Sequence, residues 1–342
     1  MLEESVSDIH HITYLTKIEL IMNFISFIVF IPLQIIFLPI GLLGIMLVAY
    51  KQMVISKQLG VSQTAIEVLN GRWTMHVFGI RQDKATEILA KSLPNTSTKG
   101  LWFCLLPLWV KYKISNRLFG YPRVPNEGKE GIADIVVART LYFDRIIDQL
   151  ADDIAQFVVL GAGYDTRAYS GLKNRGLTFF ELDQPMTQKL KVTSLRVAGI
   201  DPSHVKFVSV DFSHESIFEK LRAKGYDPNK KTIFLWEGVT LYLTEADVRK
   251  TLQDIKGNAA PGSAVIADFY GDRMIQAGSG YVGRKALGYT NEEFGFGLPF
   301  ATNFENTLKG FLDSKNLKLG QTYFMGRSNT KGPFMVVAEV HI

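Results

Sequence analysis

Two glycines that follow a run of apolar residues are the first feature that could do chemistry. Gly161 and Gly163 lie in the stretch FVVLGAGYDTRAYSG, residues 157–171, and glycine lets the backbone approach a ligand closely. A dinucleotide-binding turn would carry a third glycine, at the start of the helix that holds the pyrophosphate. Here Thr166 stands at that position, and Asp165 precedes it. Because a carboxylate repels a phosphate, the sequence favours a nucleoside without phosphates.

Further polar residues follow the next strand-like runs: Asp183 in FFELDQP, Asp211 and Phe212 in VSVDFS, and Glu237 in LWEGVTLYL. In a parallel sheet these positions share one edge, where ligands bind. Asp183 lies 22 residues after Gly161, close to the spacing at which a carboxylate binds ribose hydroxyls. Asp211 and Phe212 are suited to an adenine amine and ring. These features favour S-adenosylmethionine, an adenosine with a cationic sulfonium tail, over a nicotinamide dinucleotide.

Short β-branched runs alternate with helical segments from about residue 132 onward. We predict strands for FVVLG, TFFEL, VKFVSV, TIFLWE, AVIADF, LKLGQTYF and FMVVAEV. The first five are separated by connections long enough for helices, which is typical of parallel βαβ units, and a polar turn joins the last two. The sequence therefore predicts an α/β fold, a doubly wound sheet with an antiparallel last strand.

Five motifs between residues 138 and 243 resemble the leucine carboxyl methyltransferase family and its bacterial S-adenosylmethionine-dependent O-methyltransferase relatives. They are ARTLYFD, VVLGAGYDTRAY, FELDQP, VDF and EGVTLYL, in the order of the family. The resemblance implies a Rossmann-like class I methyltransferase sheet and extends from about Ile132 to the C-terminus. It does not cover the first 130 residues.

The resemblance also implies roles for individual residues. Arg139 would pair with the carboxylate of the cofactor, and Glu237 would lie near its amino group and sulfonium, which makes Glu237 the candidate catalytic residue. The predicted cofactor-binding set is Arg139, Gly161, Gly163, Asp183, Asp211, Phe212 and Glu237. Asp165 and Arg167 either cap and pair at a helix start or take part in function.

Histidine and cysteine offer little further chemistry. The six histidines show no metal-ligand spacing, and Cys104 is the single cysteine. We therefore predict no metal site and no internal disulfide, which fits a reducing compartment.

An apolar block dominates residues 1–50. Between Glu19 and Lys51 lie 31 residues without a charge, and as a helix they would span about 45 Å, more than the ~30 Å hydrocarbon layer. Pro32 and Pro39 leave one tilted span and a re-entrant hairpin as alternatives. A cleaved signal peptide fits less well, because the preceding flank is acidic and no small-residue cleavage site follows. A buried core helix is also disfavoured, because such long unrelieved apolarity is rare inside soluble domains. We predict a membrane-embedded segment over residues 20–50.

Residues 51–130 form a basic helical region. They carry twelve Lys and Arg against five acids, a net charge of +7, and three of the four tryptophans, Trp73, Trp102 and Trp109. This composition is typical of a membrane interface, and the positive-inside rule places the remaining domain, residues 131–342, in the cytoplasm. The piece LWFCLLPLWVKYKI either lies in the headgroup plane or packs as a helical cap on that domain. Nucleic-acid binding is the rejected alternative, because no such motif accompanies the charges.

These features together predict an S-adenosylmethionine-dependent O-methyltransferase. A carboxylate acceptor needs no general base, and no histidine lies beside the motifs to activate a hydroxyl. The glycine-rich segment 271–304 is expected to cover the acceptor site as a lid. With the membrane segment, this favours carboxyl methylation of a lipophilic small molecule. The alternatives are methylation of a protein C-terminus, or a membrane-tethered protein that binds S-adenosylmethionine without turnover.

Overall fold

The computed structural model describes residues 2–212, 215–278, 294–301 and 303–342. Seven strands among them form one sheet in the order β3-β2-β1-β4-β5-β7-β6. The strands are β1 Gln156–Leu160, β2 Thr178–Asp183, β3 Val205–Ser209, β4 Thr232–Trp236, β5 Ala264–Tyr270, β6 Lys318–Met325 and β7 Met335–His341. The first five pair in parallel, and β7 is antiparallel to both β5 and β6. The seven predicted strands and the antiparallel last strand are confirmed.

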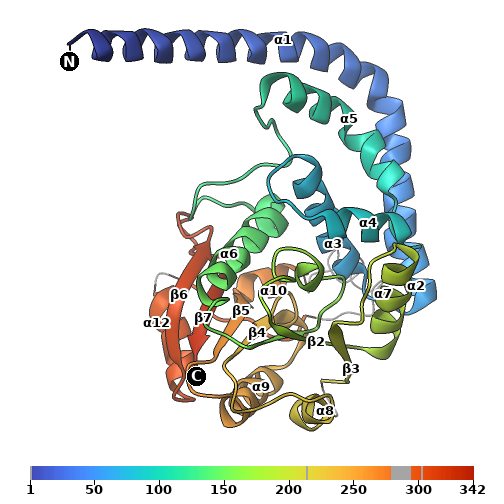
Figure 1. The fold of residues 1–342 in the computed structure, drawn as a ribbon, viewed down its shortest axis with the longest axis vertical. Coiled ribbons are helices and arrows are strands. Elements are labelled where there is room, and N and C mark those ends of the chain that lie inside the picture. The colour runs from blue at the N-terminus through green and yellow to red at the C-terminus, as the bar shows by residue number, and fades with distance from the viewer. Residues whose placement is uncertain (1, 213–214, 279–293, 302) are drawn as a thin grey trace.

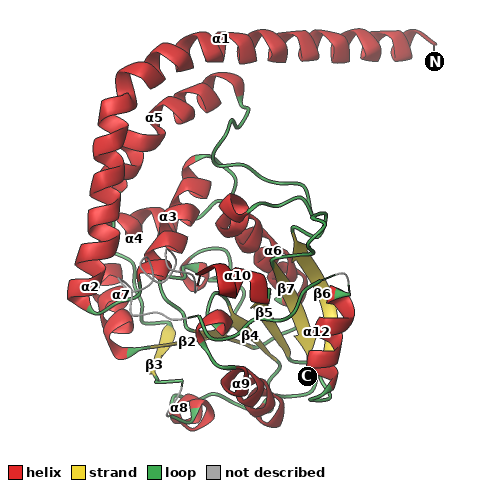
Figure 2. Ribbon diagram, turned by 180° about the vertical axis from the view of Figure 1, so that it is seen from behind, coloured by secondary structure: helices red, strands yellow, loops and turns green. Residues whose placement is uncertain are grey.

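Helices cover both faces of this sheet (Figures 1 and 2). They are α6 Ile135–Leu150, α7 Pro185–Val197, α8 Ile217–Ala223, α9 Glu245–Asn258, α10 Asp272–Gly278 and α12 Phe304–Asp313. Short 3-10 turns occur at Ile132–Asp134, Arg167–Tyr169 and Thr240–Tyr242. Alternate residues of β1 enter two different cores: Phe157 packs with α6 and α7, and Val158 with α8, α9 and α12. This two-sided burial explains why the parallel strands are continuous apolar runs.

The connection between β1 and β2 differs from the prediction, because it contains the 3-10 turn Arg167–Tyr169 and no α-helix. The side chains of Asp165 and Arg167 turn inward and are buried, as are Ala168 and Tyr169. Tertiary packing thus overrides helix formation in this segment. One consequence is that the glycine turn is not followed by an α-helix N-terminus, the feature that holds a pyrophosphate in dinucleotide-binding folds.

The N-terminal region is helical and extends away from the sheet (Figure 1). It comprises α1 Leu2–Ala49, the π-helix Tyr50–Ile55, α2 Ser56–Leu59, α3 Gln63–Val77, α4 Lys84–Ser92 and α5 Thr98–Ser115. Helix α1 is curved but continues through Pro32 and Pro39, so the structure has the single helix and not the hairpin. Residues Lys17–Leu59 are long and apolar enough to cross a membrane, a property that signal sequences share. Membrane insertion stays a prediction.

Helix α5 packs along α1 in the opposite direction. Near its start the two helices touch through glycines, since a Cβ atom on Gly44 would lie 2.6 Å from the carbonyl oxygen of Gly100. Further along, the Nζ of Lys111 donates to Oδ1 of Asn23 at 3.0 Å. On its other side, Trp102 makes an edge contact with the buried Trp73 of α3, with ring centroids 5.5 Å apart. The structure therefore shows α5 packed on α1 and α3 within the N-terminal region, and the choice between the headgroup plane and a cap on residues 131–342 stays a prediction.

We expect Gly44→Val to separate α1 from α5. The added side chain would meet the Gly100 carbonyl and the Phe103 and Cys104 side chains, and overpacking of this kind costs about 1–3 kcal/mol. Thermal unfolding in detergent measures the loss. Gly171→Val is the control, because a Cβ atom there has no neighbour within 4 Å. Equal effects of the two substitutions would contradict close packing at Gly44.

Candidate functional site

A cavity of about 1080 Å³ lies at the carboxyl ends of the parallel strands, between the sheet and α3. The structure brings all seven predicted cofactor-binding residues to its wall: Arg139, Gly161, Gly163, Asp183, Asp211, Phe212 and Glu237. Their strands meet at one sheet edge, as the sequence indicated. Their placement is therefore as expected, while their binding roles stay predictions.

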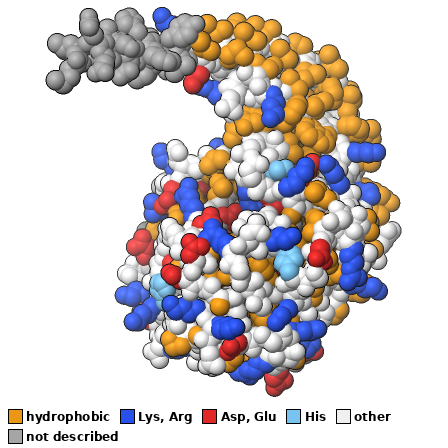
Figure 3. All heavy atoms as spheres, in the orientation of Figure 1, with side chains coloured by type: hydrophobic (Ala, Val, Ile, Leu, Met, Phe, Trp, Pro, Cys, Tyr) orange, Lys and Arg blue, Asp and Glu red, His pale blue; other side chains and the backbone are white. Residues whose placement is uncertain are grey.

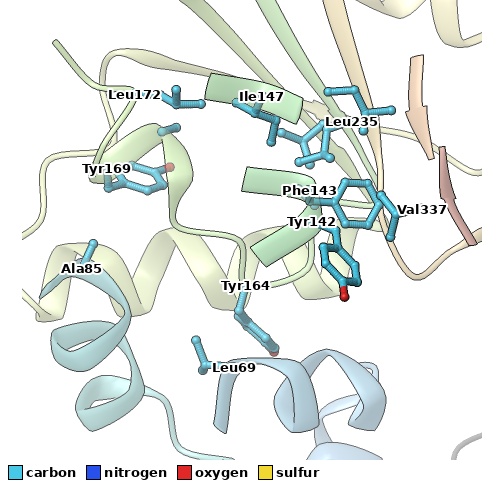
Figure 4. Close-up of a cluster of buried hydrophobic side chains, with 14 of the residues drawn as sticks. Leu69, Ala85, Tyr142, Phe143, Ile147, Tyr164, Tyr169, Leu172, Leu235 and Val337 are labelled. Atoms are coloured by element: carbon cyan, nitrogen blue, oxygen red, sulfur yellow. The ribbon is translucent and has the colours of Figure 1, made fainter. Parts of the chain in front are cut away.

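The glycine turn depends on both of its glycines. Gly161 has a φ of +70° and Gly163 a φ of +46°, values that side chains rarely tolerate. A Cβ atom on Gly161 would also lie 2.4 Å from Cγ2 of Val239, in the loop after β4. Figure 4 shows Tyr164, the next residue of the turn, close to Leu69 of α3. The turn is thus fixed between the β4 loop and the N-terminal helices.

Asp183 at the end of β2 is oriented by two backbone N–H groups. Its Oδ2 accepts from Gly163 at 2.5 Å, and its Oδ1 accepts from Gln184 at 2.7 Å. Burial raises the pKa of Asp183, and the two N–H groups oppose that shift. Each carboxylate oxygen can accept another hydrogen bond. The carboxylate on the cavity wall therefore suits a pair of neighbouring hydroxyls, as in a ribose.

Asp211 and Phe212 continue this wall after β3. The N–H of Asp211 donates to Oε2 of Glu215 at 2.8 Å, and Phe212 is half-buried against the core that includes Val210. An exposed carboxylate beside an aromatic ring can bind the amine and the face of a flat heterocycle.

Glu237, at the end of β4, is buried among three arginines. Its Oε2 accepts from Arg72 at 2.7 Å and from Arg167 at 2.9 Å, and its Oε1 lies 3.4 Å from Nε of Arg139. Burial by itself would raise the pKa of Glu237, but Arg72, Arg167 and Arg139 outweigh it and lower the pKa below its ordinary value. Glu237 is therefore ionised at neutral pH.

Asp165 completes this ionic network. It pairs with Arg167, accepts the Arg167 backbone N–H at 2.8 Å, and lies 2.8 Å from Nη1 of Arg72. Burial raises its pKa, but Arg167 and Arg72 lower it by more. The expectation that Asp165 would repel a phosphate is corrected, because Arg72 and Arg167 balance its charge. A pyrophosphate is still disfavoured, because no α-helix N-terminus follows the glycine turn.

Arg139 on α6 is held from the other side by β5. Its Nη1 donates to the hydroxyl of Tyr270 at 2.8 Å and to Oδ2 of Asp268 at 3.3 Å. Asp268 also accepts from the N–H of Gly238 at 3.0 and 2.9 Å, and burial raises the pKa of Asp268 to about 6. These contacts orient the guanidinium towards Glu237.

Four buried polar atoms of this network have no hydrogen-bond partner among the described residues: Nε of Arg72, Nε of Arg139, Nη2 of Arg167 and Oε1 of Glu237. Two of them, Nε of Arg139 and Oε1 of Glu237, belong to residues that line the cavity side by side, and lie 3.4 Å apart. Buried unpartnered polar atoms are costly and call for an explanation. An amino-acid tail carries a carboxylate for Arg139 and an ammonium for Glu237, and both would bind more closely than the 3.4 Å contact between these two side chains. The site therefore fits the tail of S-adenosylmethionine.

Three site residues escaped the sequence analysis as functional candidates: Arg72, Asp268 and Tyr270. Arg72 in LNGRWTM and Asp268 in AVIADFY are charged residues inside otherwise apolar segments. That contrast was a usable signal, because buried charges are retained where they are paired. Tyr270 had no comparable signal.

Comparisons with known proteins agree with the resemblance in the motifs. Residues 90–256 match the family model described as leucine carboxyl methyltransferase. The match begins at residue 90, which corrects the expectation that the family pattern excludes the first 130 residues.

Several bacterial relatives are named as candidate S-adenosyl-L-methionine-dependent methyltransferases. One from Mycolicibacterium smegmatis is 32% identical over 171 residues, which are 49% of this chain and 56% of that protein. One from Bacillus subtilis is 32% identical over 145 residues, 41% of this chain and 47% of that protein. The chain spans about half the length of these relatives. The predicted resemblance to the family and its bacterial relatives is confirmed.

Solved structures are similar at a greater distance. A methyltransferase candidate from Thermobifida fusca has a TM-score of 0.44 and 13% identity, covering 63% of this chain and 84% of that one. A magnesium protoporphyrin IX methyltransferase from Synechocystis has a TM-score of 0.40 and 13% identity. The match covers 63% of this chain and 89% of that one.

We expect Arg72→Met to destabilise the fold by about 3–5 kcal/mol, because it leaves two buried carboxylates with one partner fewer. Asp165 and Glu237 have folded pKa values below their ordinary 3.8 and 4.5. Their stabilisation is thus present above those values and is lost as the pH falls. Without Arg72 both folded pKa values rise, and acid unfolding should begin at a higher pH.

Melting temperature measured against pH tests this expectation. Arg175→Met is the matched control, because its partners Asp148 and Asp152 are exposed and such pairs contribute at most about 1 kcal/mol. If the melting temperature of Arg72→Met fell at the same acidic pH as that of the wild type, the result would contradict the network.

Proposed function

We propose that this chain is an S-adenosylmethionine-dependent O-methyltransferase that methylates the carboxyl group of a lipophilic, membrane-associated molecule. The observation that carries the proposal is the single cavity in which a glycine turn, a ribose-type carboxylate and the Arg139–Glu237 pair meet. The family match over residues 90–256 supports the methyltransferase class.

In this proposal, different residues of the chain bind different parts of the cofactor. Asp183 takes the ribose hydroxyls, while Asp211 and Phe212 take the adenine. Arg139 takes the carboxylate of the tail, and Oε1 of Glu237 takes its ammonium. Because Arg72 and Arg167 already bind Oε2 of Glu237, this carboxylate stays fixed and charged beside the cationic donor.

A carboxylate acceptor agrees with the groups that line the cavity. The donor supplies an activated methyl group: an acceptor oxygen forms a bond to the methyl carbon as the carbon–sulfur bond breaks, and that electron pair stays on sulfur. An ionised carboxylate needs no base for this displacement, so alignment and exclusion of water suffice. Over the described part of the chain, no histidine lines the cavity. The products are a methyl ester and S-adenosylhomocysteine.

A lipophilic acceptor is supported by the far end of the cavity. Val48 of α1 and Leu101 and Leu105 of α5 line it there. Figure 3 shows apolar side chains gathered over α1, with charged side chains spread over the domain below. We infer that residues 20–50 and the basic region 51–130 hold the enzyme on a membrane, with the catalytic domain on the cytoplasmic side.

The predicted lid, residues 271–304, is described only in part. Residues 279–293 and 302 lie outside the described residues. On either side of the longer gap, Met274 and Phe294 line the cavity. These two side chains support a covering role for the segment.

Incubation of the purified protein with methyl-labelled S-adenosylmethionine and a membrane extract tests the proposal. We expect label in the lipid fraction that mild alkali releases as methanol, because esters hydrolyse and ethers do not. Label in protein would favour the protein C-terminus alternative. Cofactor binding without any labelled product would indicate a binding protein and overturn the enzymatic proposal.

We expect Asp183→Asn to weaken S-adenosylmethionine binding roughly 10- to 100-fold, the range for losing hydrogen bonds to a charged group. Calorimetric titration measures the affinity. Asp201→Asn removes an exposed carboxylate that does not line the cavity, so its affinity should equal that of the wild type. An unaltered affinity in Asp183→Asn would exclude this carboxylate from the cofactor site.

A further inference from the structure

A second, smaller hollow of about 260 Å³, open to the outside of the molecule, lies between the end of α1, the π-helix and α5. Its wall consists of Ile45, Val48, Ala49, Gln52, Met53, Leu101 and Cys104. Four of these residues, Val48, Gln52, Leu101 and Cys104, also line the main cavity. We call this space the side cavity; it adjoins the far end of the proposed reaction site.

The lining of the side cavity is mainly apolar and suits a hydrocarbon group. Five of its seven lining residues are aliphatic or methionine side chains. The thiol of Cys104 is turned to the backbone and donates to the carbonyl of Gly41 at 3.4 Å. A water molecule needs two or more polar partners to be held in such a space, so an apolar group is the better occupant.

Its position connects the membrane segment with the reaction site. The side cavity lies at the C-terminal end of α1, within the candidate span Lys17–Leu59. Neighbouring side chains of α1 are apolar and exposed, Ile45 by 57% and Met46 by 67%. An alkyl chain could therefore pass from a bilayer into the protein along mainly apolar surface, with Gln52 as the polar residue that lines both cavities. The close contact of Gly44 with Gly100 bounds the opening on one side.

We propose that the side cavity binds the alkyl tail of the acceptor and thereby selects a long-chain carboxylic acid presented by the membrane. This inference rests on the proposed function, since the carboxyl group of the same molecule would lie in the main cavity, next to the methyl group of the donor. The molecule enters between α1 and α5 with its carboxyl group first, and its alkyl tail then lies in the side cavity. Specificity for chain length then resides in the N-terminal helices and not in the sheet domain.

Two substitutions change the side cavity in opposite directions. Ala49→Phe fills it, and Met53→Ala enlarges it; neither residue lines the main cavity. Leu43→Phe is the matched control, because it adds the same ring to α1 at a residue that is 50% exposed and lines neither cavity. Cofactor titration shows whether each variant retains its folded site.

The first measurement is methyl transfer to a series of straight-chain acids from butanoic to hexadecanoic. Each methylene that enters an apolar site tightens binding about fourfold, so KM should fall with length until the cavity is full. The acid length at which KM stops falling should change in the variants. It should be shorter in Ala49→Phe and longer in Met53→Ala. Leu43→Phe should follow the wild type.

The second measurement is independent of turnover. Hexadecanoic acid with a photoreactive diazirine near its methyl end should label peptides that contain residues 45–53 and 101–104. The label should be lost in Ala49→Phe and kept in Leu43→Phe. Three outcomes would overturn the inference. The label could be confined to residues 20–43, it could be unaffected by Ala49→Phe, or it could be absent.

The two proposals can fail separately. Transfer to short acids with no dependence on chain length leaves the methyltransferase standing and removes the side cavity from substrate selection. Specific photolabelling without any methyl transfer removes the proposed reaction and leaves the alkyl site.

Discussion

The buried carboxylate of Glu237 and the arginines around it are the interaction on which the site depends. Arg72 comes from α3, Arg139 from α6 and Arg167 from the turn after β1. Because a buried charge is tolerated only when it is paired, these three segments must meet at the end of β4. The network thus joins the N-terminal helices to the sheet and forms one wall of the cavity.

The sheet and most of the site could be predicted from the sequence, because both follow local rules. Apolar runs with turn signals gave the strands, and strand ends in a parallel sheet share an edge, which brought Asp183 and Glu237 together. The connection after β1 could not be predicted, because its inward-facing residues are satisfied by distant partners. Asp165 pairs with Arg72, 93 residues earlier in the chain. Pairing over such a distance leaves no periodic pattern in the sequence.

The N-terminal region has two roles in the proposed function. Its α3 supplies Arg72 to the cofactor end of the cavity, while α1 and α5 supply the apolar walls at the acceptor end. Its exposed apolar surface is therefore continuous with the inside of the enzyme. Under the proposed membrane insertion, a change in how α1 meets a bilayer would act on substrate access, whereas a change in α3 would act on the charge balance around Glu237.

A double-mutant cycle between Arg72 and Glu237 measures the coupling in this buried network. Unfolding free energies are measured for the wild type, Arg72→Met, Glu237→Gln and the double variant at neutral pH. Residues within one buried ionic network show coupling on the order of 0.5–3 kcal/mol, and we predict a value in the upper part of that range. Additive losses would show that α3 and the sheet edge do not share this network and would contradict its role in joining them.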